Sequence, residues 1–246
     1  MPARFALVLA VMACALVGSA CGVLAQRYEY EEEIYLRLDG SATVNVNASV
    51  ASLVALRGVD LPVDPKARLD RGQVRALFQS PGAPAPRVNL SRRDGRRFVH
   101  VSLEIPDVRQ MQRQPMFAWS TYRFDRDGDS VVYRQRVGPP AAKAVDRGGW
   151  TGRELVVFKM HIPSEIPYHN APSRKTERGN ILRWEQPLAA RLKGEPLDVE
   201  VRMEPESILV TTLVLFGLTI VAAAIMFGLV IWWLARRGRE SEELPV

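Results

Sequence analysis

The chain has 246 residues, a net charge of +6, and two cysteines, Cys14 and Cys21, both near its N-terminus. So mild a positive charge argues against nucleic acid as a partner. The absence of later cysteines excludes disulfides, thiol catalysis and cysteine-ligated zinc from the rest of the chain. Setting aside a leader and a C-terminal apolar run leaves about 180 residues, enough for one sizeable domain with an ordinary core.

Residues 1–25 have the pattern of a signal peptide. Arg4 precedes an apolar run, Phe5–Val17, and small residues follow before Cys21. Such a segment directs export and is excluded from the fold. Three outcomes stay open: lipobox cleavage with lipid attachment at Cys21, ordinary cleavage after Ala25, and retention as an uncleaved anchor. We favour lipidation of Cys21.

The exported domain, residues 26–206, opens with a predicted β-hairpin. Tyr28–Leu38 and Ala42–Val50 alternate apolar and polar residues, and an Asp-Gly pair between them favours a tight turn. Glu29 and Glu31–Glu33 are predicted to form the solvated side of the first strand.

Two short helices are expected next. Ala51–Arg57 predicts a helix that ends at Gly58. Asp64 is suited to cap a second helix with Pro65 at its first position, running to about Gln79.

The remainder of the domain predicts further hairpins. Arg87–Ile105 and Thr121–Val137 each contain an Asp-Gly turn, with a brief helix over Pro106–Gln114 between them. Leu155–Ile162 is predicted as a central strand because its apolar run is long. The last strands are expected at Asn180–Glu185 and Leu197–Met203. The pattern predicts an α+β fold in which an antiparallel, hairpin-rich sheet packs with two or three short helices.

The chain then predicts one C-terminal transmembrane helix, residues 207–235. Ile208–Leu234 carries no charge, and about 20 such residues span a bilayer core. Interfacial tryptophans and a cluster of arginines at the far end place the tail, residues 236–246, in the cytoplasm. The predicted location is the bacterial cytoplasmic (inner) membrane, single-pass, with the domain outside. The residues that carry this orientation are Trp232, Trp233, Arg236, Arg237 and Arg239.

The closing portion resembles a known family. Phe158–Pro163, a polar turn, the stretch Gly179–Trp184, a last strand, an apolar span and basic residues follow in the order seen in the LppM-type family of bacterial envelope proteins. Ser164 departs from that pattern, since relatives commonly have glycine there. The resemblance implies a membrane-tethered, lipid-binding α+β domain with a curved antiparallel sheet, and glycolipid handling for the mycobacterial member.

Two basic clusters are candidates for contact with phosphate headgroups or acidic polymers, because guanidinium groups bind phosphate in bidentate fashion. The alternative is that both are simply solvated turns. The first surrounds an Asp-Gly turn and contains Arg92, Arg93, Arg96 and Arg97; the second contains Arg174, Lys175 and Arg178.

Other residue types give weaker indications. Three tryptophans are expected in the core or in the wall of a pocket: Trp119, Trp150 and Trp184. Three histidines are expected to be structural, without a metal: His100, His161 and His169. Asp125, Asp127 and Asp129 are expected at a hairpin tip and not in a calcium loop.

No nucleophile–base pair or cofactor motif is evident, so the expected protein is not an enzyme and binds no cofactor. Two functions stay open. One is a binding module for a lipid, a glycolipid or an anionic surface. The other is a structural or assembly factor that binds another envelope protein through a sheet edge or through the small residues Ala224 and Gly228 of the span.

Overall fold

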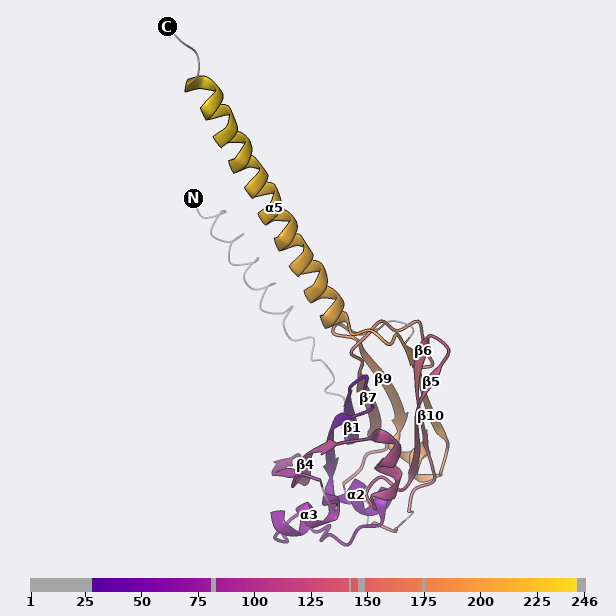
Figure 1. Ribbon diagram of the computed structural model, residues 1–246. Helices are drawn as coiled ribbons and strands as arrows, with labels where there is room; N and C mark the ends of the chain where they lie inside the picture. Colours follow the sequence, from indigo (N-terminus) through magenta and orange to yellow (C-terminus); the bar gives the residue numbers. More distant parts are fainter. Residues whose placement is uncertain (1–27, 81–82, 142, 146–148, 174–175, 243–246) are drawn as a thin grey trace, which may run out of the picture.

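The computed structural model describes residues 28–80, 83–141, 143–145, 149–173 and 176–242 (Figure 1). The predicted signal peptide and Cys21 lie outside these residues. The predicted α+β class with a C-terminal apolar helix is confirmed. The strands divide between two sheets, however, where the sequence predicted one.

The larger sheet has six strands in the order β3-β4-β2-β1-β7-β9. Its first four strands are the two hairpins predicted first in the chain, and the strands of each hairpin pair antiparallel. β1 and β7 pair in parallel, so the long apolar strand lies inside the sheet, as predicted. The strands are β1 (Tyr28–Leu36), β2 (Ala42–Ser49), β3 (Arg87–Arg93), β4 (Arg96–Ile105), β7 (Leu155–His161) and β9 (Ile181–Pro187).

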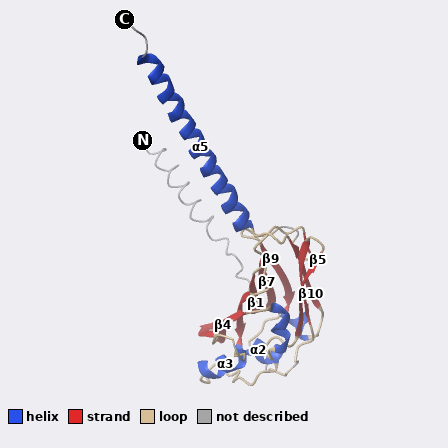
Figure 2. Ribbon diagram, viewed as in Figure 1, coloured by secondary structure: helices blue, strands red, loops and turns tan. Residues whose placement is uncertain are grey.

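The smaller sheet is antiparallel, in the order β5-β6-β10-β8. It forms a second layer beside β1, β7 and β9 (Figure 2), and alternating apolar residues of both sheets form one continuous core. The short strand β8 lies in the polar stretch between Pro163 and Gly179. The strands are β5 (Ser120–Asp127), β6 (Ser130–Val137), β10 (Leu197–Met203) and β8 (Tyr168–His169).

The described part of the domain also contains four short helices: α2 (Val50–Arg57), α3 (Arg71–Phe78), the 3-10 helix η2 (Val108–Arg113) and α4 (Leu188–Leu192). The first forms as predicted. The Ser49 side chain caps it by accepting from the Ser52 amide, and Gly58 ends it with φ 69°.

The predicted helix over residues 65–79 is wrong in its first half. Asp64 caps only a turn, accepting the Lys66 amide at 2.8 Å. The helix begins at Arg71, because a second cap, Asp70, accepts the amide of Gly72.

One long helix, α5 (Ile208–Glu242), leaves the domain at one end of the larger sheet (Figure 1). Its first amide donates to the carbonyl of Pro163, which follows the end of β7. Thr212–Leu234, 23 residues with mean hydropathy 2.7, is long and apolar enough to cross a membrane. The helix continues beyond the predicted span.

The strand register defines the two ends of the larger sheet. Tyr35 pairs with His161 beside α5, and we call this the α5-proximal end. The opposite, distal end carries Ser49, which pairs with Phe98, and the Asp94-Gly95 turn. The two ends of β2 lie roughly 23 Å apart at 3.3 Å per residue.

Candidate functional site

Buried arginines are the most informative feature of the described residues. A guanidinium is rarely buried without an ionic partner, since its desolvation is costly. Four arginine side chains are buried. Two of them form a salt bridge with a carboxylate, and the other two have no carboxylate within salt-bridge distance among the described residues. The paired arginines are Arg57 and Arg96, and the unpaired ones are Arg97 and Arg191.

The acidic partners come from β1. Glu29 and Glu32 were predicted on a solvated face, and this is wrong for both: each is 0% exposed. Glu32 shares the core face of β1 with Tyr30 and Ile34, because alternate residues of a strand face the same side.

The Glu32 carboxylate is the centre of a buried polar network between the sheets. It accepts hydrogen bonds from the Tyr30 hydroxyl at 2.8 Å and the Gln135 amide at 2.9 Å. The Tyr122 hydroxyl donates at 3.3 Å, and the Arg57 guanidinium lies at 3.2 Å. The charge of Arg57 is therefore matched inside the core.

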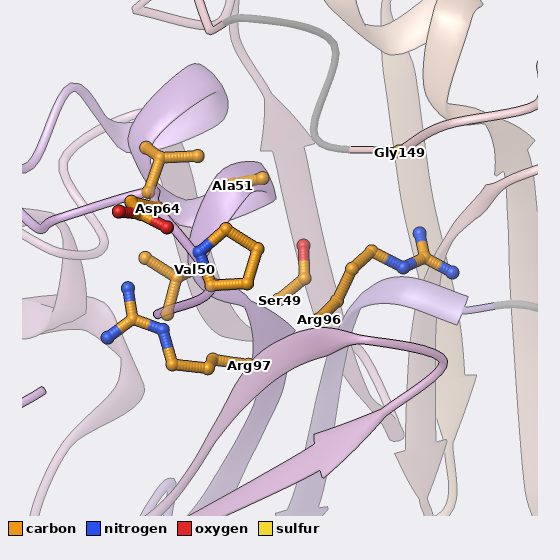
Figure 3. A pocket seen from close by; sticks show the side chains of 9 residues that line it. Ser49, Val50, Ala51, Asp64, Arg96, Arg97 and Gly149 are labelled. Atoms are coloured by element: carbon orange, nitrogen blue, oxygen red, sulfur yellow. The ribbon is translucent and has the colours of Figure 1, made fainter. Parts of the chain in front are cut away.

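A surface hollow of about 360 Å³ lies at the distal end, where α2 begins (Figure 3). Apolar side chains of Val50, Ala51, Val63 and Pro65 form much of its wall. The other lining residues are Ser49, Asp64, Arg96, Arg97 and Gly149. We call it the Arg97 hollow.

Arg97 gives this hollow its charge. Its terminal nitrogens donate to the backbone carbonyls of Ala67 and Pro62, while its Nε is buried without a partner. Burial, and secondarily the charge of Arg92, lower the pKa of Arg97. The N-terminus of α2 adds partial positive charge on the same side. Asp64 is exposed, also lines the hollow, and acts on the pKa of Arg97 in the opposite direction. The lining therefore combines apolar walls with the buried Arg97 charge and one exposed carboxylate.

The predicted basic hairpin tip needs correction. Only Arg92 and Arg93 are exposed, whereas Arg96 and Arg97 are 8% and 7% exposed. Arg96 pairs with Glu29 at 2.5 Å, so the strand alternation turns part of the cluster inward. Arg93 donates to the Tyr28 carbonyl at 2.8 Å. In the second cluster Arg178 is exposed, and Arg174 and Lys175 lie outside the described residues.

The three predicted tryptophans do not line the Arg97 hollow. Trp184 is 1% exposed in the core and donates to Asn170 at 2.9 Å. Trp150 donates to the buried carboxylate of Glu29 at 3.0 Å. Trp119 stacks beneath Arg57 between the sheets.

The structure also brings together a set that the sequence did not indicate. Ser91 Oγ lies 2.7 Å from His100 Nε2, and His100 Nδ1 lies 2.9 Å from Asn47 Oδ1. Burial and the charge of Arg93 lower the pKa of His100, which favours neutral imidazole. These residues come from three adjacent strands, so only the strand register reveals them.

The remaining histidines do not meet. His161 lies on the larger sheet, 2.8 Å from Glu33, and stacks on Tyr35, whereas His169 lies on the smaller sheet. Within the described part of the chain, no group of three or more metal-ligating side chains gathers.

Comparison with known proteins gives a similarity of fold and no similarity of sequence family. No family model and no curated protein matches the chain. A search of solved structures finds the NMR structure of the folded domain of LppM from Mycobacterium tuberculosis, with 12% identity and a TM-score of 0.40. The match covers 74% of this chain and 94% of that one. The similarity is weak by both measures.

Proposed function

We propose that this chain is a membrane-tethered, extracytoplasmic binding module without catalytic activity. Its exported domain holds an anionic group, carried by a lipid, a glycolipid or an acidic envelope polymer, in the Arg97 hollow. The observation that supports this is a buried guanidinium with an unpartnered Nε and no described carboxylate within salt-bridge distance. An anion seated there would supply the missing charge and acceptor.

The walls of the hollow suit a ligand with an apolar part beside its charge. A volume of about 360 Å³ falls at the small end of ligand sites, enough for a headgroup and a short stretch of chain. The Arg97 hollow is thus proposed to take the anionic end of an amphiphile.

The membrane orientation is part of the proposal. Thr212–Leu234 would cross the bacterial inner membrane, with the arginines that follow it in the cytoplasm. The Arg97 hollow lies at the distal end of the sheet, roughly 20 Å beyond the α5-proximal end. The ligand is therefore proposed to be a lipid lifted from its bilayer, or a polymer outside it, and not the headgroup surface around α5.

The test uses full-length protein in dodecylmaltoside micelles, titrated calorimetrically with dihexanoyl phosphatidylglycerol. Arg97→Met should weaken binding about 10- to 100-fold, since a charge-assisted hydrogen bond contributes about 1.5–3 kcal/mol. Arg92→Met is the matched control: this neighbour is exposed and lies outside the hollow. Equal affinities for both variants would overturn the proposal.

A second variant keeps the test valid if Arg97→Met unfolds the domain. Val63→Phe retains every charge but fills the hollow, so it should weaken the phospholipid and spare inorganic phosphate. Dihexanoyl phosphatidylcholine, whose headgroup is zwitterionic, should bind more weakly than phosphatidylglycerol. Failure of all probes to bind wild-type protein would reject this function.

The alternative, an assembly factor for another envelope protein, draws on the outer strands of the larger sheet. β3 is an edge strand on which Arg87, Asn89 and Ser91 are exposed. Exposed charge on an edge protects it against strand addition, which makes β3 a poorer docking site. We would favour the assembly-factor function only if the ligand titrations fail.

A further inference from the structure

The second unpaired arginine, Arg191, lies inside the domain. It belongs to α4 and is 0% exposed. One terminal nitrogen donates to the carbonyl of Gly138 at 2.6 Å. Its Nε and its other terminal nitrogen are buried without partners. The three nitrogens of a guanidinium carry five N–H donors, so most of the donor capacity of Arg191 is unused.

Arg57 has the same deficit nearby. Its side chain is 2% exposed; one terminal nitrogen meets Glu32 and Tyr30, and its Nε and other terminal nitrogen have no partner. Both guanidinium carbons face the ring of Trp119, at 3.3 Å for Arg57 and 5.7 Å for Arg191. The indole Nε1 of Trp119 is also buried and unpartnered. Five buried nitrogen atoms of these three side chains, the indole Nε1 included, thus lack an acceptor.

The charges are unequal as well. Two guanidinium groups share this interior, and Glu32 is the one described carboxylate within salt-bridge distance of either. Glu195, the acid whose charge acts on Arg191, is exposed. Burial first, and then the neighbouring charge of Arg57, lower the pKa of Arg191. An uncompensated buried charge is strongly destabilising, so this arrangement favours an added negative charge.

We infer that a small monovalent anion, chloride or a carboxylate of formate size, binds between Arg57 and Arg191 beside Trp119. It would accept from both guanidinium groups and the indole N–H, and balance the second positive charge. None of the four described hollows is lined by Arg57, Arg191 or Trp119, so the proposed occupant is a small ion and not a larger ligand. The site is separate from the Arg97 hollow and does not depend on the proposed function.

The test is thermal unfolding of the full chain in micelles at constant ionic strength, with chloride exchanged for gluconate, an anion too large for the site. Above its dissociation constant, chloride should raise the midpoint by roughly 3–5 °C for each tenfold increase in concentration, because only the folded state binds it. Formate should raise the midpoint in the same way, because it would occupy the same site. Arg191→Met should abolish the dependence, while Arg178→Met, an exposed control, should retain it.

A second readout does not require the variant to fold. Chlorine-35 line broadening by wild-type protein should saturate and be reversed by formate. Two results would overturn the inference: a midpoint that is independent of the anion, which would mean that buried water satisfies these donors, or an Arg191→Met protein with unchanged chloride dependence.

Discussion

Glu32 provides the sharpest test of the buried network. Replacing it with glutamine preserves the shape but leaves one acceptor oxygen where the carboxylate offers two, each engaged by two donors. One pair of donors then faces an amide N–H₂, and the Arg57 charge loses its partner. Removing one member of a buried ion pair costs about 3–5 kcal/mol. For a domain with about 5–15 kcal/mol of stability, that is a large fraction.

The assay is urea unfolding of full-length protein in mild micelles, followed by tryptophan fluorescence. Glu32→Gln should lower the midpoint with an unchanged slope, which would show that the folded state lost stability. The double variant Glu32→Leu/Arg57→Met should cost less than the sum of its single changes, because apolar residues replace a buried pair well. Additive costs, or a cost below about 1 kcal/mol for Glu32→Gln, would refute the reasoning.

Three further outcomes are expected. Burial raises the pKa of Tyr122 well above its usual value, so this hydroxyl ionises at a lower pH in the unfolded chain than in the folded one. The free energy of unfolding should therefore fall as pH rises above about 10. Tyr122→Phe should reduce that loss in urea titrations at alkaline pH. A cysteine introduced as Ser241→Cys should resist a membrane-impermeant maleimide in intact cells, and labelling would reverse the proposed orientation. Despite the Ser91–His100 contact, a fluorophosphonate probe should not modify Ser91; modification that His100→Gln abolishes would contradict a purely binding role.

Local signals predicted most of the strands. Alternation and Asp-Gly pairs located three hairpins, since both depend on neighbouring residues alone. The first half of the predicted second helix does not form, because Asp64 and Asp70 compete as caps. The sequence also does not show that Arg97 donates to the carbonyl of Ala67 between them. The division into two sheets depends on long-range pairing, such as β1 with β7, which no local pattern encodes.

The candidate site was less predictable. The run of glutamates in β1 has the composition of a solvated strand face, yet Glu32 occupies a core position in the strand alternation. The alternation that places Glu32 on the core face could be read from the sequence. Its pairing with Arg57 could not, because Arg57 lies at the end of α2, far from Glu32 in the chain. In the same way, Arg97 was noticed as part of a basic turn, but its burial depends on the Pro62–Ala67 segment folding over it.

The attachment of α5 to the domain sets how far the protein reaches. Only residues 204–207 separate β10 from α5. The amide of Glu204 donates to the carbonyl of Glu165, and the first amide of α5 donates to that of Pro163. A connection this short and hydrogen-bonded would allow little rotation of the domain relative to α5. The Arg97 hollow would therefore stay at a nearly constant distance from the bilayer. Ligands would be captured from a thin layer of the envelope at that height. Inserting flexible residues after Met203 would widen this layer without changing the intrinsic affinity, because encounter frequency depends on tether length.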